Sequence, residues 1–282
     1  MAGTTPGILY LVATPIGNLG DITRRAVQTL QDVDFIAAED TRVTRKLMEH
    51  LSIKKALISY NKNNQNERGG KILSRILAGE NCALVTDAGT PGISDPGEQL
   101  VKLCADAGIP LTTLPGPCAA VCALALSGLP TGRFTFEGFL STARKSRFEH
   151  LSQLKKEQRT MIFYEAPHKL SRTLNDMLEA FGDRRISISR ELTKIYEETI
   201  RFTLSEAIAH YSQLPPRGEF VLVIEGAKPP PAPVIEIDGA IASAKTYIDQ
   251  GMSVKDAVKK AAEEASVPKN TLYNAVIKNI KE

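Results

Sequence analysis

The stretch Asp87-Ala88-Gly89-Thr90-Pro91-Gly92-Ile93-Ser94-Asp95-Pro96-Gly97 decides the fold, because it joins a buried strand to a helix through a Gly- and Pro-rich loop. Upstream, Cys82-Ala83-Leu84-Val85-Thr86 is a continuous apolar run, which is typical of a strand buried on both faces. Downstream, Asp95 is the expected N-cap of the helix, with Pro96 at the first helical position and Glu98 in a capping box. The glycines and prolines leave bare, stiff backbone that a ligand can approach closely. The stretch therefore predicts a ligand loop, and the alternative is a plain strand-to-helix turn.

Two further apolar runs end in loops of the same kind. Leu9–Ala13 precedes Thr14-Pro15-Ile16-Gly17-Asn18-Leu19-Gly20-Asp21, and Leu111–Leu114 precedes Pro115-Gly116-Pro117. In open α/β sheets, ligands bind outside the carboxyl ends of the strands. Three Gly/Pro loops at strand ends therefore predict one ligand crevice along that edge of the sheet.

Apolar strand runs alternate with amphipathic helices in the first part of the chain, which favours a parallel sheet covered on both faces. The expected strands there are residues 9–13, 35–38, 57–59, 82–86 and 111–114. A second set of expected strands comprises residues 134–138, 161–164, 186–189, 198–203 and 220–225. We therefore predict an N-terminal α/β domain over residues 1–130 and a second α/β domain over residues 131–228. Neither GxGxxG nor GxxxxGK[ST] occurs, so the dinucleotide-binding and P-loop classes lose their usual support.

The last part of the chain is organised separately. Residues 229–236 contain four prolines and predict a stiff, extended linker. Residues 237–282 predict a small three-helix module of helix-turn-helix type, with Ser253 and Asp256 capping its second helix. Residues 229–282 carry seven lysines and seven acidic residues, so they have no net charge. A packing or RNA-touching module is therefore favoured over a basic DNA-reading domain.

Composition narrows the function classes without deciding among them. The formal net charge of +3 over 282 residues is too small to indicate nucleic acid by itself. The four cysteines form no CxxC pair, so neither a zinc site nor a disulfide framework is expected. The N-terminus lacks a secretory pattern, and no apolar run approaches the roughly 18 residues of a membrane span. A soluble cytoplasmic protein without membrane contact is the expectation.

Six motifs, taken in order, resemble one family. They are Thr14-Pro15-Ile16-Gly17-Asn18-Leu19, Ala38-Glu39-Asp40-Thr41-Arg42, the stretch 87–97, Leu114-Pro115-Gly116-Pro117, Phe163-Tyr164-Glu165 and Arg190-Glu191-Leu192-Thr193-Lys194. Together they resemble the tetrapyrrole-methylase-like (class III) S-adenosylmethionine-dependent methyltransferases, and within them the branch of the 16S rRNA (cytidine-2'-O)-methyltransferases. The resemblance covers roughly residues 7–226 and continues into the tail. It implies two α/β domains with a cofactor cleft between them, a small C-terminal helical module and a homodimer.

The resemblance also implies a cofactor site and a partner. The cofactor is S-adenosyl-L-methionine, and the partner is 16S rRNA within the small ribosomal subunit. The family's cofactor positions fall on Pro15, Asp87, Ala88, Gly89, Ile93, Ala119, Ala120, Tyr164 and Leu192. For Asp87, a role as a loop cap is an equally good alternative. No metal is implied.

Methyl transfer to a ribose hydroxyl is an in-line displacement, so the protein mainly positions the reactants and assists removal of the hydroxyl proton. A carboxylate, or a lysine of lowered pKa, is a suitable base. The expected groups for catalysis and RNA positioning are Glu39, Asp40, Arg42, Glu165 and Lys194, with Arg45 and Arg190 beside them. Three structural alternatives stay open. Asp40 can cap a helix that starts near Thr41, Arg190 and Glu191 can form an ion pair, and His168 can have a capping or core role.

RNA binding needs cations that face phosphates. Candidate clusters are Arg42, Arg45 and Lys46, then Arg144, Lys145 and Arg147 in a loop-like stretch, and Arg184 with Arg185. Clusters that rim one cleft would form an RNA track, whereas scattered ones are ordinary surface.

Two other functions compete with rRNA methylation. One is a methyltransferase acting on a tetrapyrrole or another small molecule, and the other is a non-catalytic RNA-binding assembly factor. Against the small molecule stand the segment Glu39-Asp40-Thr41-Arg42, the basic residues between 141 and 160, and the helical tail.

Overall fold

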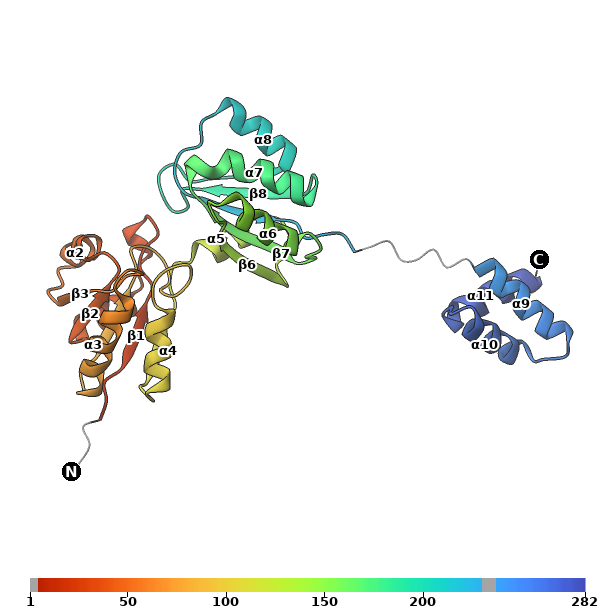
Figure 1. The fold of residues 1–282 in the computed structure, drawn as a ribbon, viewed down its shortest axis with the longest axis horizontal. Helices are drawn as coiled ribbons and strands as arrows, with labels where there is room; N and C mark the ends of the chain where they lie inside the picture. The colour runs from red at the N-terminus through yellow and green to blue at the C-terminus, as the bar shows by residue number, and fades with distance from the viewer. Residues whose placement is uncertain (1–4, 230–236, 282) are drawn as a thin grey trace. The chain divides into compact units, whose positions relative to one another are not determined.

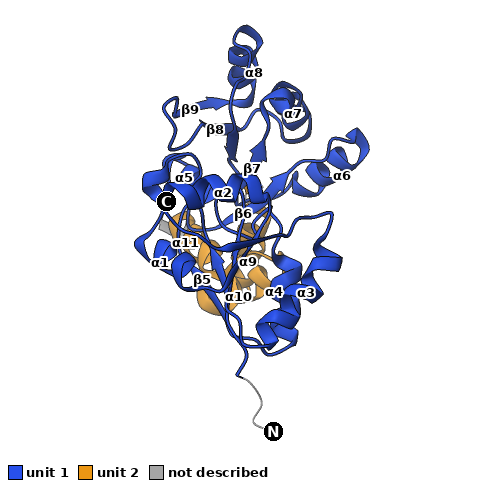
Figure 2. Cartoon of the chain, turned by 90° about the vertical axis from the view of Figure 1, so that its left-hand side faces the viewer, with its two compact units in different colours: residues 1–227 blue, residues 228–282 orange. Residues whose placement is uncertain are grey.

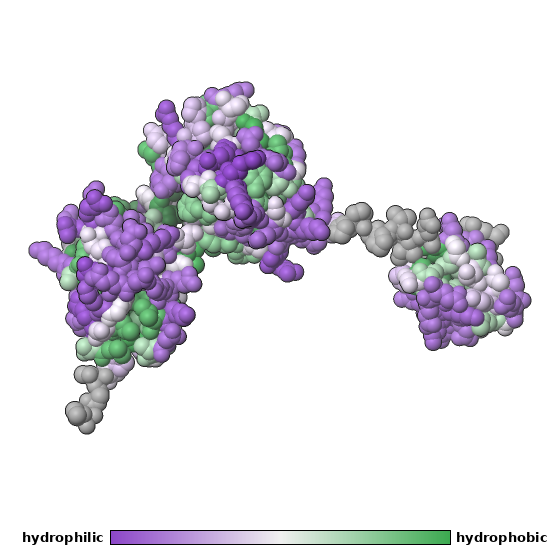
Figure 3. Space-filling model, viewed as in Figure 1, coloured by the Kyte–Doolittle hydropathy of each residue, from purple (hydrophilic) through white to green (hydrophobic). Residues whose placement is uncertain are grey.

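The computed structural model describes residues 5–229 and 237–281. The chain forms two compact units, residues 1–227 and residues 228–282 (Figures 1 and 2). The first unit holds both β-sheets, and the second is entirely helical within the part that is described. Hydrophilic side chains cover most of the face shown in Figure 3, with hydrophobic patches between them.

The first sheet is fully parallel and has the strand order β3-β2-β4-β1-β5. Its strands are β1 (Leu9–Val12), β2 (Phe35–Ala38), β3 (Ala56–Ser59), β4 (Cys82–Val85) and β5 (Leu111–Leu114). The central strand β4 is buried at every residue, as its continuous apolar run predicts.

Helices cover both faces of this sheet, because successive side chains of each strand point to opposite sides. On one face, Cys82 and Leu84 of β4 pack with α3 (Gln65–Leu77) and α4 (Glu98–Asp106). On the other face, Ala83 and Val85 pack with α1 (Arg24–Asp32) and α2 (Thr41–His50). A single-turn helix, η1 (Leu19–Asp21), precedes α1.

The second sheet has the order β6-β7-β10-β8-β9 and is mixed. Only the pair β6–β7 is parallel, and the other neighbours run antiparallel. Its strands are β6 (Phe134–Phe139), β7 (Thr160–Glu165), β8 (Arg185–Arg190), β9 (Glu198–Thr203) and β10 (Phe220–Ile224).

The two faces of the second sheet are covered differently. Helices α6 (Arg144–Leu154), α7 (Pro167–Phe181) and α8 (Leu204–Gln213) bury one face. Helix α5 (Ala119–Leu126) lies on the other face, where Ala120, Ala123 and Leu124 pack with residues of β7 and β10. Although α5 precedes the domain boundary expected near residue 130, it packs on the second sheet. The exact boundary stays a prediction.

The start of α4 differs from the expectation. The sequence suggests Asp95 as N-cap, but the helix begins at Glu98, with Gly97 as N-cap at φ +150°. Gly92 and Ser94 adopt left-handed φ values of +81° and +65°, so the loop makes a further turn before the helix begins. A Cβ on Gly97 would lie 3.0 Å from the Gly92 nitrogen, which explains the glycine there. Asp95 therefore does not cap α4.

The second unit is a three-helix module of α9 (Ile237–Asp249), α10 (Val254–Glu264) and α11 (Lys269–Lys281). Its core includes Ala244, Val258, Ala261 and Leu272. The Ser253 hydroxyl accepts a hydrogen bond from the Asp256 N–H at 3.2 Å, as the predicted cap requires. No helix among residues 5–229 and 237–281 is long and apolar enough to cross a membrane.

Candidate active site

A cavity of about 470 Å³ lies between the two sheets of the first unit. The first sheet contributes Ile16, after β1, and residues 88–90 and 93–95, after β4. The second sheet contributes the ends of β7 and β8 and the start of β10, which is antiparallel to both. The strand edges that were expected to carry a ligand therefore surround one cavity.

Hydrogen bonds join the three Gly/Pro loops of the first sheet. Thr14 and Gly89 exchange two hydrogen bonds, of 2.9 and 3.0 Å, which link the loop after β1 to the loop after β4. The Thr90 hydroxyl donates to the Pro117 carbonyl at 3.1 Å, which adds the loop after β5. Gly89 has φ +82°, and a Cβ there would lie 3.4 Å from Cγ2 of Ile16. The cavity wall at Gly89 is therefore bare backbone.

Tyr164, at the end of β7, forms an aromatic wall of the cavity. Its hydroxyl accepts a hydrogen bond from the Ala120 N–H at 3.1 Å. Its ring meets Phe136 and Phe139 edge-on, with centroid distances of 5.1 and 5.5 Å. Burial raises the pKa of Tyr164 to about 12. The side chain is therefore a neutral, fixed surface against which a flat or apolar ligand group can pack.

Lys194 enters the cavity from the loop after β8. Its ammonium donates to Glu191 at 2.9 Å and to Glu219 at 2.8 Å. Burial alone would lower the pKa of Lys194, but the hydrogen bonds to Glu219 and Glu191 outweigh it and raise that pKa. The alternative of a lysine base with a lowered pKa is therefore wrong for this residue. Lys194 acts as a fixed positive charge.

Glu165 is 3% exposed and its carboxylate is already engaged. One oxygen accepts the Ala166 N–H at 2.8 Å, and the other accepts the Thr173 hydroxyl at 2.5 Å. These bonds fix the start of α7, which lies at the cavity. Glu165 therefore shapes the wall, and a direct part in the chemistry stays a prediction.

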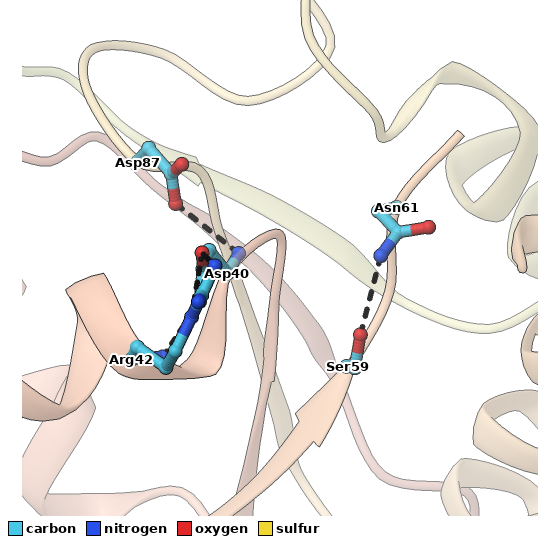
Figure 4. Close-up of polar contacts among 5 residues, drawn as sticks. All are labelled: Asp40, Arg42, Ser59, Asn61 and Asp87. Carbon is cyan, nitrogen blue, oxygen red and sulfur yellow. Dashed lines mark hydrogen bonds and ion pairs between the residues drawn. The ribbon is translucent and has the colours of Figure 1, made fainter. Parts of the chain in front are cut away.

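Glu39, Asp40 and Asp87 meet where β2 and β4 end, because these strands are neighbours in the sheet. The Asp40 N–H donates to Asp87 at 3.1 Å, and the Asp87 N–H donates to Glu39 at 3.4 Å. Asp40 also accepts the Arg42 N–H at 2.8 Å and pairs with the Arg42 guanidinium at 2.6 Å (Figure 4). Asp40 is thus the N-cap of α2, which was the structural alternative for this residue.

The pKa values of the carboxyl groups around these strand ends shift in two opposite directions. Hydrogen bonds from Arg42, side chain first, hold the pKa of Asp40 at about 2. Burial, in contrast, raises the pKa of Glu39 and of Asp87. Burial also raises the pKa of Asp95 to about 6, helped by the nearby Glu39 and opposed by Lys62. Glu39, Asp87 and Asp95 are therefore a group of partly buried carboxyls that interact with one another.

Comparison with known proteins identifies the fold around this cavity. Residues 8–208 match the family described as Tetrapyrrole (Corrin/Porphyrin) Methylases. The chain belongs to this methylase family. The methylase is 49% identical over 268 residues to Ribosomal RNA small subunit methyltransferase I of Synechocystis sp., covering 95% of this chain and 96% of the relative. It is 48% identical over 273 residues to the protein of that name in Bacillus subtilis, covering 95% and 94%.

Solved structures confirm the predicted architecture of the methylase. The methyltransferase CobJ has a TM-score of 0.59 at 18% identity, covering 81% of this chain and 97% of that one. A uroporphyrin-III C-methyltransferase from Thermus thermophilus, solved with S-adenosylhomocysteine, has a TM-score of 0.55 at 19% identity, covering 78% and 97%. At these identities the likeness shows the fold alone.

The structure brings most of the expected site residues of the methylase to the cavity. From the cofactor set it includes Ala88, Gly89, Ile93, Ala119, Tyr164 and Leu192, and from the catalytic set Glu165 and Lys194. Pro15 and Asp87 line a separate hollow of about 230 Å³ instead. Ala120 reaches the cavity through its bond to Tyr164. Glu39, Asp40 and Arg42 lie beside Asp87, outside the cavity wall. The roles assigned to these residues stay predictions.

The cavity also contains side chains that were not among the expected site residues. They include Ser94, Asp95, Cys118, Phe139, His168, Ser189 and Glu219. The sequence predicts Asp95 as a helix cap. The signal that could have placed it in the site is its carboxyl group, because Glu39 and Asp87 also follow strand ends. His168 is exposed and makes no cap hydrogen bond, so the capping and core interpretations are wrong.

Two of the expected arginine roles are corrected. Arg147 belongs to α6 and not to a loop, and its side chain is 2% exposed and paired with Asp176 at 2.6 Å. It therefore cannot face RNA. Arg190 pairs with Glu198 at 3.2 Å and not with Glu191, because Glu191 is paired with Lys194 instead. Arg42, Arg45 and Lys46 remain exposed along α2.

Proposed function

We propose that this methylase transfers a methyl group from S-adenosyl-L-methionine to the ribose 2'-oxygen of a cytidine in the decoding region of 16S rRNA, within the small ribosomal subunit. The observation that carries the proposal is the two-sheet cavity in a chain that is 41–49% identical to proteins named Ribosomal RNA small subunit methyltransferase I. The proposed place of action is the cytoplasm.

The cavity fits a donor of this kind. Its volume of about 470 Å³ lies in the range of small-molecule sites. Ile93, Tyr164 and Leu192 supply apolar surface, and Gly89 allows close approach to backbone. The Asp95 carboxyl group at the wall favours a positively charged ligand, whereas the Glu219 carboxylate is already paired with Lys194. When bound, S-adenosyl-L-methionine supplies an activated methyl group on a cationic sulfur.

The protein's own part is to position the acceptor and remove its proton. Asp40 is held ionised by Arg42, and Lys194 is held charged by Glu191 and Glu219, so both are poor bases. Glu39 is the expected catalytic group whose pKa moves toward neutrality, because it is partly buried. We propose Glu39 as the acceptor of the hydroxyl proton, with Arg42 and Arg45 contacting RNA phosphates beside it.

Labelled S-adenosyl-L-methionine, offered with unmodified small ribosomal subunits or a porphyrinogen in parallel, tests the proposal. We expect label in 16S rRNA, at a cytidine whose adjoining phosphodiester resists alkali because its 2'-oxygen is blocked. Label only in the porphyrin product would contradict the proposal and favour the small-molecule alternative. No label together with no cofactor binding would favour a non-catalytic assembly factor.

Arg42→Ala is expected to weaken RNA binding severalfold and to reduce its salt dependence by about one phosphate contact. The Arg42 side chain is 85% exposed and, within the described part of the chain, is paired with Asp40, so a phosphate can reach it. Affinity for the cofactor should not change, because Arg42 lies outside the cavity wall. Lys71→Ala is the control, since this exposed lysine of α3 pairs with Glu67. Filter binding at several salt concentrations checks the prediction, and normal RNA affinity with normal turnover would contradict it.

Removal of residues 229–282 should leave cofactor affinity within about twofold. All described residues of the cavity wall lie between Ile16 and Val221, in the first compact unit. We propose that the helical module contacts RNA, so the shortened protein should bind small subunits more weakly. Calorimetry on both forms checks the cofactor, and lost cofactor binding would show that the tail completes the cavity.

We further propose that the methylase works as a homodimer. Helix α5 is apolar all round, and its outer side leaves Val121 56% and Leu126 42% exposed. Such a helix is usually buried on both sides. A second copy packed on this side of α5 would cover it, and light scattering that gives a single-chain mass would contradict the proposal.

A further inference from the structure

A second hollow, of about 520 Å³, adjoins the cavity between the two sheets, in which we place the methyl donor. It lies between the first turns of α3 and α4, and Asp95 lines both spaces. The acceptor oxygen must come within roughly 3–3.5 Å of the transferred carbon, so the acceptor nucleotide has to enter next to the donor. The hollow of about 230 Å³ beside Asp87 is below the usual size of a ligand site, whereas this one is within it.

The lining of this hollow suits a nucleotide. Its lining combines side-chain amides, positive charges and negative charges, from Gln65, Asn66 and Gln99, from Lys62 and Lys102, and from Asp95 and Glu98 respectively. Amides read the edges of nucleobases, and lysines bind phosphates. An apolar or purely cationic lining would be expected for a lipid or a simple anion, and neither is present here.

The polar groups of the hollow are held in place by the fold. The Gln99 amide donates to the Asn66 side chain at 2.8 Å and ties α4 to α3. Lys62 donates to the Ser94 carbonyl at 3.1 Å, so its charge is fixed beside the ligand loop. The turn that carries Lys62 is held by the Asn61 side chain, whose oxygen accepts the Asn63 N–H at 3.0 Å. The Asn61 amide in turn donates to the Ser59 hydroxyl at 3.3 Å (Figure 4). A preorganised set of this kind binds with less loss of side-chain entropy.

We propose that this hollow receives the base of the nucleotide that is methylated, and that Asp95 selects cytosine over uracil there. The inference rests on the proposed function and adds a specificity-determining residue to it. A cytosine presents an amino donor that a carboxylate accepts, whereas uracil presents a carbonyl oxygen that a carboxylate repels. Lys102, at the exposed end of the lining, then contacts the adjoining phosphate.

The position of Asp95 supports this selection. The residue is half-buried, so solvent does not fully satisfy its carboxyl, and burial raises its pKa to about 6. Glu39, Asp87 and Lys62 are the charged groups close to it. A carboxyl with this pKa is mostly ionised at neutral pH, and the ionised form accepts from the cytosine amino group and repels the uracil carbonyl oxygen.

Asp95→Asn is the direct test, on small subunits that carry either cytidine or uridine at the target position. An amide pairs equally well with both bases, because it has a donor and an acceptor. We expect the preference for cytidine in kcat/KM to fall roughly tenfold to hundredfold, which is the discrimination that one good base contact supplies. Glu67→Gln makes the same chemical change on α3 outside the hollow and should keep the preference. An unchanged preference in Asp95→Asn would overturn the inference.

Lys102→Glu provides an independent test at an exposed position of α4. We expect KM for small subunits to rise severalfold, with kcat and the affinity for S-adenosyl-L-methionine unchanged. An unchanged KM would overturn the inference even if Asp95→Asn fails to fold. Failure of the unaltered protein to methylate any RNA would refute the proposed function itself, so the two failures are distinguishable.

Discussion

Replacing Gly89 by valine is expected to weaken binding of S-adenosyl-L-methionine at least hundredfold, which corresponds to about 2.7 kcal/mol. Gly89 has φ +82°, a region that a β-branched residue enters at a cost of about 1–3 kcal/mol. The new side chain would also meet Ile16, whose Cγ2 lies 3.4 Å from an ideal Cβ. The double hydrogen bond between Gly89 and Thr14 would be strained, and the bare wall of the cavity would be lost.

Calorimetric titration with the cofactor, together with thermal unfolding, measures the two consequences separately. Gly70→Ala is the matched control, because Gly70 lies within α3 and a Cβ there meets nothing within 4 Å. That control should bind the cofactor normally and gain about 0.5–1 kcal/mol of stability, since glycine is unfavourable inside a helix. A folded Gly89→Val protein with normal cofactor affinity would show that the ligand loop is not part of the cofactor site.

Arg147→Met is expected to lower the free energy of unfolding of the first unit by about 3–5 kcal/mol. The Arg147 guanidinium pairs with Asp176 at 2.6 Å between α6 and α7, and the side chain is 2% exposed. It also donates to the carbonyls of Ser141 and Thr142, at 2.9 and 3.0 Å, and so fixes the turn before α6. The substitution leaves the Asp176 carboxylate buried without its partner. A loss of this size is a large share of the stability of a typical domain.

Urea unfolding of two further forms distinguishes a buried ion pair from general damage. The double variant Arg147→Met with Asp176→Leu should recover much of the loss, because it removes the unpaired charge. Arg159→Met breaks the more exposed pair with Glu157, at 2.6 Å, and should cost much less stability, because solvent screens that pair. Equal losses in the Arg147 and Arg159 variants would contradict the account of the buried pair.

Local patterns in the sequence predict the sheets and the ligand edge well. The continuous apolar run of β4 is buried at every residue because helices cover both faces of the sheet. The expected ends of β2, β5 and β9 coincide with the structure. The rule that ligands bind at the carboxyl ends of strands predicts that the loops after β1, β4 and β5 lie together. Backbone hydrogen bonds between Thr14 and Gly89, and a bond from the Thr90 hydroxyl to the Pro117 carbonyl, do join them.

What the sequence does not reveal depends on partners far along the chain. The sequence around Arg147 predicts a surface cation, but the side chain is buried and pairs with Asp176, which is 29 residues away. Lys194 is held charged by Glu219, 25 residues away, so its type alone gives no sign of its protonation. Asp95 fits a capping pattern, but the left-handed backbone at Gly92 and Ser94 moves the helix start beyond it. Residue type suggests chemistry, and only the three-dimensional neighbours decide it.

A crystal structure with S-adenosylhomocysteine tests the central claim most directly. The account predicts that this product lies in the cavity between the two sheets, against the backbone of Gly89 and the side chains of Tyr164 and Leu192, with its sulfur toward the hollow that Asp95 shares. Electron density for the product elsewhere on the protein, with this cavity filled by the protein's own side chains, would contradict the account.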